Sequence, residues 1–232
     1  MNKNADQDKK QRIVKAAMEI FVESPDSFTM KGISKKARVK EAEIYSFFPN
    51  KSAILKHYYV TIVPAYQGMI REIEGYKEYD LSEKLSNFVF SSLDMMQEQR
   101  DFVEKTFDEL VFRASPKSGF QEHVEALVGE FMEDDPRISA SNQYLLNTVA
   151  FHLITREYFY LVKFWMKDDS TGSEKTMALT DKLTALLSEV LYSGVLDKGI
   201  DLGRFLISNR VINPKLPFWD TFVERFTWEG KA

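Results

Sequence analysis

The sequence predicts an all-α protein with an N-terminal helix-turn-helix domain followed by a larger helical domain. Apolar residues recur at intervals of three and four along most of the chain, and no segment alternates apolar and polar residues as a strand does. Near the N-terminus, short helical patterns separated by tight turns precede the longer ones. These two observations favour a small helical head on a larger helical body.

The first helix of the head is predicted over residues 9–23, where the apolar side chains fall on one helical face. Those side chains are Ile13, Ala16, Ala17, Ile20 and Phe21. The run Ser24-Pro25-Asp26-Ser27 ends it.

Thr29 is a suitable N-cap for a second helix over residues 30–37, and a third is predicted over residues 41–48. Pro49 cannot continue that helix because proline lacks the backbone N–H and clashes with the preceding turn. Asn50 can cap a long fourth helix that extends to about residue 74 and is kinked at Pro64.

Further helices are predicted in the body, separated by turns rich in Ser, Asp, Gly and Pro. They cover residues 81–98, 100–114, 119–133, 143–166, 173–193 and 202–209. A last aromatic segment over residues 218–228 is predicted to be a short helix that docks on the body.

The composition is that of an ordinary globular protein, with 44% apolar and 28% charged residues among 232. No apolar run reaches about 18 residues and the N-terminus lacks an apolar signal core, so we expect neither membrane insertion nor export. Cysteine is absent, which excludes disulfides, thiolate catalysis and cysteine metal sites. We therefore expect a cytoplasmic protein.

The charge is distributed unevenly between head and body. Residues 1–58 contain 12 Lys or Arg and 7 Asp or Glu, a balance of +5, whereas the rest holds 19 and 28, a balance of −9. A basic head on an acidic body indicates that the head meets a polyanion. The alternative is a chance fluctuation of surface charge.

Residues 9–58 resemble the DNA-binding domain of TetR-family transcriptional regulators. The matching positions are Thr29, Ile33, Ala37, Val39, Ile44, Tyr45, Phe48, Lys51 and Leu55. The resemblance implies a DNA-binding domain over residues 1–58 and a ligand-binding and dimerisation domain over residues 59–232. It also implies a homodimer that binds a palindromic double-stranded DNA operator, most often as a repressor, and responds to a small effector.

By this resemblance, the third helix is the recognition helix and lies in the major groove. We expect the phenol of Tyr45 to donate to a phosphate and Lys51 to add a charge at the start of the fourth helix. The residues expected to meet DNA are Thr29, Lys40, Glu41, Ala42, Tyr45, Ser46, Phe47 and Lys51.

Three departures from the family pattern stand out in the head. Arg38 occupies a turn position that favours a small residue because the backbone there often has a positive φ. Phe47 cannot donate to a phosphate, so stacking or contact with a thymine methyl is its expected role. Glu41 and Glu43 oppose phosphates; each either accepts from cytosine N4 or supports the helix N-terminus.

In the body, the resemblance carries over only the architecture, in which the helices over residues 143–166 and 173–193 form the dimer interface. The second has an apolar stripe of Leu179, Leu183, Leu186, Leu187, Val190 and Leu191, which on spacing alone favours plain core over interface.

Aromatic richness, with 18 Phe and 10 Tyr, favours an apolar or aromatic effector. The residues predicted to bind it are Phe107, Asn147, Phe151, His152, Thr155 and Tyr158, and for each of them plain core packing is the alternative.

Enzymatic and metal-binding functions find little support in the sequence. The three histidines have no metal-ligand spacing, and no phosphate loop or nucleophile elbow is present, so we expect no enzyme, metal or cofactor. The acidic turn at residues 133–135 is expected to be solvated. The competing function is a helical small-molecule carrier or adaptor whose head has lost DNA affinity, which Glu41, Glu43 and Phe47 favour.

Overall fold

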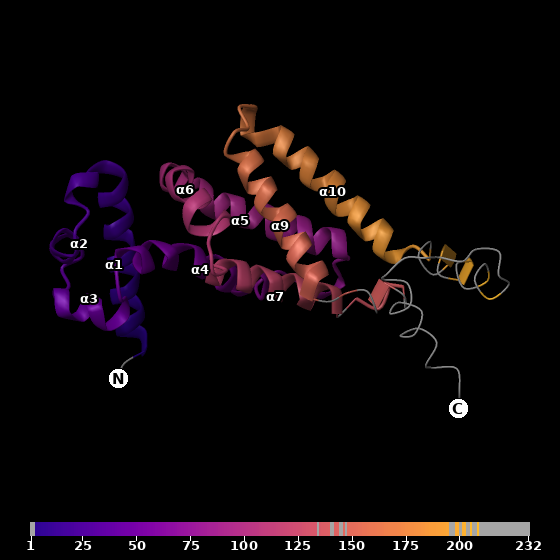
Figure 1. Ribbon diagram of the computed structural model, residues 1–232, viewed down its shortest axis with the longest axis horizontal. Coiled ribbons are helices and arrows are strands. Elements are labelled where there is room, and N and C mark those ends of the chain that lie inside the picture. The colour runs from indigo at the N-terminus through magenta and orange to yellow at the C-terminus, as the bar shows by residue number, and fades with distance from the viewer. Residues whose placement is uncertain are drawn as a thin grey trace.

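The computed structural model describes residues 3–133, 135–139, 142–143, 146, 148–194, 198–199, 201–202, 205 and 208, and in these residues the regular elements are helices without a strand. Figure 1 shows a head built from α1, α2 and α3, and a body of longer helices into which α4 runs from the head. The predicted fold class is therefore confirmed.

The head packs α1 (Lys3–Glu23), α2 (Met30–Ala37) and α3 (Glu41–Phe47) around one small core. Its fully buried side chains come from each of these helices and from the start of α4: Ile13, Ala17, Ile33, Ile44 and Ile54. Helix α1 begins six residues earlier than the sequence predicts, and Phe48 follows α3 as an extended, buried residue. These burial positions match the apolar period of the sequence.

A close backbone approach fixes the entry to α2. Thr29 caps the helix by accepting from the Gly32 N–H at 3.0 Å, as predicted. A Cβ on Gly32 would lie 2.4 Å from the carbonyl oxygen of Ser27, which is backbone and cannot rotate away. Only glycine therefore fits at this position.

The turn between α2 and α3 places Arg38 in the left-handed region, with φ 54° and ψ 43°, which confirms the predicted positive φ. The Ser34 hydroxyl donates to the carbonyl oxygen of Val39 at 2.8 Å and ties the turn back to α2. An ordinary side chain in this conformation is strained, so the turn retains Arg38 at a cost in stability.

Helix α4 (Lys51–Ile70) begins at the predicted cap, where Asn50 accepts from the Ala53 N–H at 2.8 Å. It ends at Ile70, earlier than the predicted residue 74, and Pro64 lies inside it on the exposed side. Tyr59 and Tyr66 are fully buried, so α4 is a structural part of both head and body.

The body consists mainly of five helices described in chain order after η2 (Tyr76–Glu78). These are α5 (Leu81–Gln97), α6 (Arg100–Phe107), α7 (Gly119–Glu133), α9 (Thr148–Trp165) and α10 (Glu174–Tyr192). Two short turns, η1 (Pro25–Ser27) in the head and η4 (Thr171–Ser173) before α10, join longer elements.

The predicted single helix over residues 100–114 is wrong in part, because α6 passes into a π-helical turn, η3 (Asp108–Phe112). Of the predicted helix over residues 202–209, only residues 202, 205 and 208 are described. The predicted aromatic segment over residues 218–228 lies outside the described residues.

The acidic turn before Pro136, predicted to be solvated, is exposed at Glu133 but buried at Asp135, and Asp134 lies outside the described residues. The Asp135 carboxylate is fully buried, accepts two hydrogen bonds from the Arg137 guanidinium at 2.9 Å, and accepts one from the Tyr192 hydroxyl at 2.7 Å. Tyr192 in turn accepts from the Leu81 N–H at 3.0 Å. This network ties the end of α10 to the start of α5.

Candidate DNA-binding and effector sites

The outer surface of α3 exposes most of the residues predicted to meet DNA. Glu41, Ala42, Tyr45 and Ser46 are exposed, with Tyr45 at 52%. They lie at i, i+1, i+4 and i+5, so they share one face of the helix, opposite the buried Ile44. Phe47 is half-buried at the edge of that face, with the Lys10 ammonium 5.5 Å from its ring centre.

The two glutamates of α3 have different surroundings. Glu43 pairs with Lys9 on α1 at 2.7 Å, and its other oxygen accepts from the Lys40 N–H at 3.3 Å. The hydrogen bond from Lys9 holds the pKa of the Glu43 carboxyl below its usual value. Glu41 is exposed and has no hydrogen bond or ion pair among the described residues. Glu43 therefore supports the N-terminus of α3, whereas the Glu41 carboxylate is free to accept a hydrogen bond from a ligand.

Cationic groups surround the exposed face of α3. Lys40 and Arg38 are exposed immediately before the helix. On the far side, Lys51 donates to the carbonyl oxygen of Phe28 at 2.7 Å, with its ammonium 4.9 Å from the Phe28 ring centre. This bond uses one of the three ammonium protons of Lys51 and holds the group beside Thr29.

The head contacts the body through α1 and α6 as well as through α4. The rings of Phe21 and Phe102 meet edge to face at 6.2 Å, and Lys105 donates to the carbonyl oxygen of Val22 at 3.3 Å. Tyr58 on α4 donates to the carbonyl oxygen of Met95 at 3.1 Å. Head and body are therefore connected by two sets of contacts, those of α1 with α6 and those along α4.

The residues predicted to bind the effector do not form one open pocket. Phe107 and Tyr158 are buried in an aromatic core with Phe120 and Phe159, and the Tyr158 hydroxyl donates to Ser92 at 2.9 Å. Phe151 packs against Gly129. Asn147 lies outside the described residues.

The remaining two, His152 and Thr155, line a narrow cleft of about 30 Å³, which has room for one or two water molecules. His152 and Lys117 both hydrogen-bond the Glu125 carboxylate there, at 2.7 and 2.8 Å. The Thr155 hydroxyl is buried without a partner among the described residues. This arrangement is polar and too small for an organic effector.

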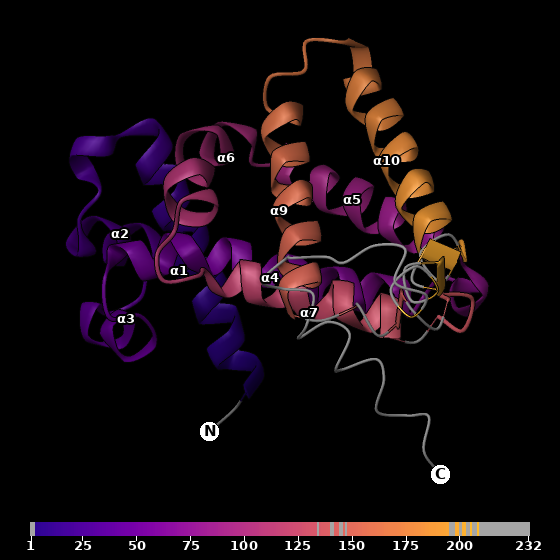
Figure 2. The same ribbon diagram turned by 45° about the vertical axis from the view of Figure 1, so that its right-hand side comes forward.

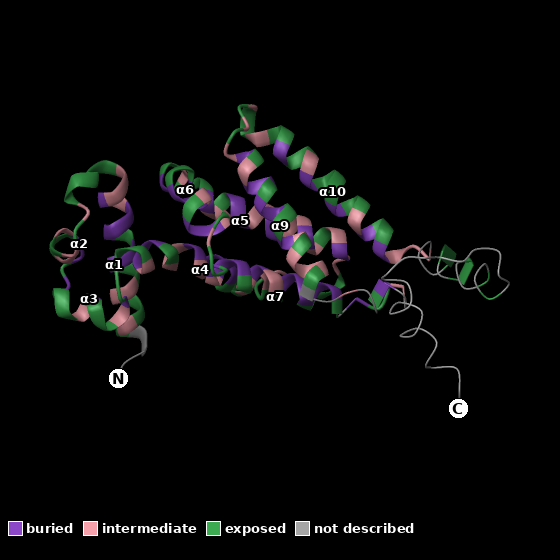
Figure 3. Ribbon diagram, in the orientation of Figure 1, coloured by how far each residue is buried: buried purple, intermediate pink, exposed green. Residues whose placement is uncertain are grey.

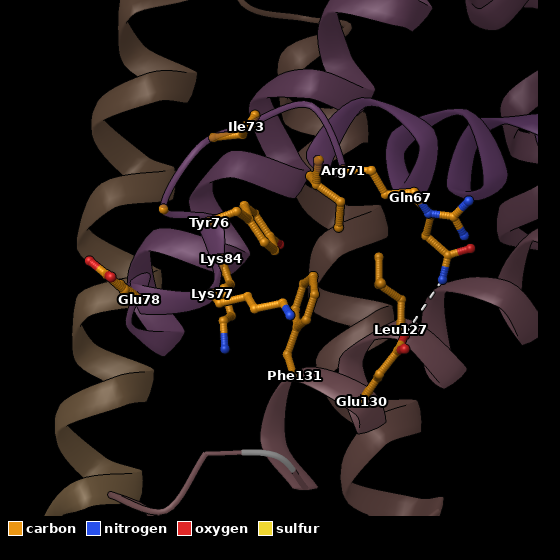
Figure 4. Close-up of a pocket in the computed structure, with 12 residues that line it drawn as sticks. Gln67, Arg71, Ile73, Tyr76, Lys77, Glu78, Lys84, Leu127, Glu130 and Phe131 are labelled. Atoms are coloured by element: carbon orange, nitrogen blue, oxygen red, sulfur yellow. Dashed lines mark hydrogen bonds between the residues drawn. The ribbon is translucent and has the colours of Figure 1, made fainter.

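A much larger cleft lies between the end of α4, η2, the start of α5, and α7, and we call it the α4–α7 cleft (Figure 4). Its volume is about 880 Å³, within the range of small-molecule sites. No motif in the sequence indicates this cleft, because it forms only where residues 67–84 meet residues 127–131 of α7.

A third surface feature is the outward face of α10, where Met177, Leu186 and Val190 are 45–58% exposed. The neighbouring α9 exposes Val149, Leu153, Tyr160 and Phe164. Figure 2 shows α9 and α10 running in opposite directions on either side of their connecting loop, and Figure 3 shows exposed residues along both helices. The expectation that the α10 stripe is plain core is therefore wrong for Leu183, Leu186 and Val190, whereas Leu191 is buried as expected.

Within the described residues, no group of three or more histidine or acidic side chains could hold a metal ion. No helix among them is long and apolar enough to cross a membrane.

Comparison with protein families assigns both parts of the chain. Residues 13–58 match the model of bacterial regulatory proteins of the tetR family. Residues 84–206 match the model of the tetracyclin repressor-like C-terminal domain. A comparison with curated proteins gives no significant match.

Two solved structures share the fold. The fatty acid degradation regulator FadR from Bacillus halodurans is 20% identical, with a TM-score of 0.52 over 76% of this chain and 94% of its own. The TetR family repressor AlkX from Dietzia sp. strain DQ12-45-1b is 18% identical, with a TM-score of 0.52 over 78% of this chain and 94% of its own. AlkX is implicated in biodegradation of n-alkanes.

Proposed function

Since the chain belongs to the TetR family of DNA-binding transcriptional regulators, which are not enzymes, we propose that it is an effector-responsive repressor. In this proposal residues 1–58 bind a palindromic operator and residues 59–232 dimerise and bind the effector. The exposed polar face of α3, flanked by Arg38, Lys40 and Lys51, supports the DNA-binding role most directly.

We assign two kinds of contact to this face. The Tyr45 hydroxyl, the Lys51 ammonium and the hydroxyl proton of Thr29 donate to phosphates and position α3 in the major groove. Glu41, Ala42 and Ser46 face base edges, with Lys40 beside them, and Phe47 contacts a thymine methyl or sugar. Lys51→Ala should weaken binding to all sequences alike and lower the salt slope by about one.

The unequal surroundings of the two glutamates allow a matched test of base reading. Glu41→Gln should relax the preference at one base pair by about 1–3 kcal/mol and raise affinity for unrelated DNA, because a repulsive charge is removed. Glu43→Gln should lower the thermal midpoint of the head through the lost Lys9 pair and leave the base preference unchanged. The binding of both variants is measured against every single-base variant of the operator. A change confined to one base pair for Glu41→Gln means that Glu41 reads that base, and a uniform change means that it reads no base.

We propose that the second copy of the chain covers the outward apolar face of α9 and α10. A two-fold operator reader needs two heads, and such a reader places them on half-sites about 10–10.5 base pairs apart. The exposed residues Leu186 and Val190 of α10 would lie in the dimer core. Obligate interfaces of this kind are rich in apolar side chains.

The effector response would pass through α4, which begins beside α3 and ends at the α4–α7 cleft. An effector that favours one orientation of α4 in the body also favours one spacing of the two heads. FadR concerns fatty acid degradation and AlkX concerns n-alkanes, and both topics favour an apolar portion in the effector.

Selection of bound sequences from a random DNA pool tests the proposed function. The expected result is an inverted repeat whose half-site centres are one helical turn apart. Failure to enrich any sequence at low salt would contradict the DNA-binding role and favour the carrier function instead.

A further inference from the structure

The α4–α7 cleft combines an apolar floor with an unusual set of charges. Leu127 and Phe131 on α7 are 2% and 6% exposed, and Ile70 and Ile73 beside them are half-buried. Leu127 and Phe131 form the buried base of the cleft, and the more exposed Ile70 and Ile73 offer the apolar surface that a hydrocarbon body can contact. Figure 4 shows Tyr76 and Lys77 on one side of Phe131 and Leu127 on the other.

Three cations line the same cleft without an acidic partner. Arg71, Lys77 and Lys84 form no ion pair or side-chain hydrogen bond among the described residues. Elsewhere in the body, cations such as Lys163 and Arg137 pair with carboxylates at 2.7–2.9 Å. Unpaired lysines also occur at exposed positions such as Lys167 and Lys182, so what distinguishes this cleft is that its three cations line one apolar cleft.

Two carboxylates also line the cleft and reduce its charge. The Glu130 carboxylate is held by a long hydrogen bond of 3.5 Å from Gln67 across the cleft. The Glu78 carboxylate points away from the other labelled side chains in Figure 4. The three cations and two carboxylates give the lining of the cleft a net charge of +1. The charge balance favours an anion.

A pair of tyrosines adds a neutral donor. The hydroxyls of Tyr66 and Tyr76 lie 2.7 Å apart. Burial raises the pKa of both phenols, so both keep their protons at neutral pH. The pair uses one of its two protons internally, and no other acceptor among the described residues takes the second. When Tyr66 donates, the Tyr76 proton is free for a ligand oxygen in the cleft.

From these features we infer that the α4–α7 cleft binds an amphipathic carboxylate. Its carboxylate lies among Lys77, Lys84, Arg71 and the Tyr76 hydroxyl, and its apolar body lies against Ile70 and Ile73, beside the buried Leu127 and Phe131. A neutral hydrocarbon would desolvate the cations without pairing them, and an organic cation would meet them directly. This inference rests on the proposed function only in naming the effector class.

Titration calorimetry on the full chain, without DNA, tests the site with three ten-carbon probes below their micellar concentrations. Decanoate should bind, decanol should bind at least tenfold more weakly, and decyltrimethylammonium should show no binding. Equal binding of decanoate and decanol would overturn the inference.

Amino-acid substitutions then test where the carboxylate of the bound decanoate lies. Lys77→Ala with Lys84→Ala should lower decanoate affinity at least tenfold and leave decanol unchanged. The control is Lys15→Ala with Lys167→Ala, which removes the same charge from exposed positions outside the cleft and should change nothing. Tyr76→Phe should lower decanoate affinity severalfold. An equal loss in the control pair, or no loss in the cleft pair, would refute this placement.

A separate measurement of operator affinity keeps this inference distinct from the proposed function. Decanoate that binds in the cleft but leaves operator affinity unchanged upholds the site and refutes the effector response. Absence of DNA binding refutes the proposed function, while the calorimetric result for the cleft stands by itself.

Discussion

The head and α10 use amphipathic helices in opposite ways. In the head, apolar residues such as Ile13, Ile33 and Ile44 are fully buried and polar residues face outward. In α10 most of the buried side chains are small and hydroxylic, namely Thr176, Thr180, Thr184 and Ser188. Its exposed side chains include the apolar Met177, Leu183, Leu186 and Val190, while Leu191 is buried.

On the inner face of α10 the three threonine hydroxyls find partners nearby, whereas the Ser188 hydroxyl is buried without a partner among the described residues. The Thr180 hydroxyl donates to the Thr176 carbonyl oxygen at 2.9 Å, and Thr184 bonds Ser82 and Ser86 at 3.1 and 2.8 Å. The core of the head is therefore complete within one protomer. The outer face of α10 instead exposes apolar side chains that a partner could bury.

The largest expected difference in protomer stability is that between Ile44→Ala and Leu186→Ala. Ile44→Ala empties a fully buried site and should destabilise the head by about 2–5 kcal/mol. Leu186 is 58% exposed, so Leu186→Ala should change the stability of one protomer by less than about 0.5 kcal/mol and weaken only dimerisation. Denaturant unfolding of dilute protein measures both, and similar losses would refute the contrast.

The next effect uses two glycines. Gly32→Ala forces a methyl group against the Ser27 carbonyl and should destabilise the head by about 3 kcal/mol. Gly68→Ala on α4 meets nothing within 4 Å and should stabilise the protein by about 0.5–1 kcal/mol, because alanine favours a helix. Thermal unfolding compares the two, and an unchanged stability of Gly32→Ala would argue against the tight α2 entry.

The Asp135 network sets a pH dependence at the end of α10. Although burial raises the pKa of Asp135, hydrogen bonds from Arg137 and Tyr192 outweigh it and lower the pKa from 3.8 to about 2. The carboxylate therefore contributes stability above pH 3.8 that is lost as pH falls through about 2, on the order of 2 kcal/mol.

Asp135→Asn should lose this contribution at neutral pH and show a flatter stability profile between pH 4 and 2. Denaturant midpoints measured across that interval test it. A variant profile parallel to that of the wild type would mean that Asp135 titrates normally.

The smallest effect compares the two left-handed residues, one in each region. Arg38 has φ 54° in the head and Ser173 has φ 57° before α10. Replacing either with glycine relieves strain and should stabilise the protein by about 1 kcal/mol or less. Only Arg38→Gly should also weaken DNA binding, since it removes a charge beside α3. Equal DNA affinities of the two variants would exclude Arg38 from the interface.

Sequence periodicity predicted most helices and the head core, because Ile13, Ile33 and Ile44 have their partners within one short segment. It could not predict the direction of the α10 stripe, since Leu186 and Thr184 have equally good helical spacing and only α5 decides which turns inward. It placed Tyr158 in a pocket, although Phe88 and Phe120 fill that space. The α4–α7 cleft joins residues 67–84 to residues 127–131 of α7, and no local pattern indicates this pairing.

The stoichiometry and affinity of the operator complex test the central proposal most directly, with wild type and Leu186→Glu compared by sedimentation. We expect two wild-type protomers per inverted repeat. We expect Leu186→Glu to be a monomer with a folded head and at least a hundredfold weaker operator binding. A wild-type monomer that binds one half-site with full affinity, or a Leu186→Glu protein that still binds as a dimer, would contradict the proposal that α9 and α10 join the two DNA-binding heads.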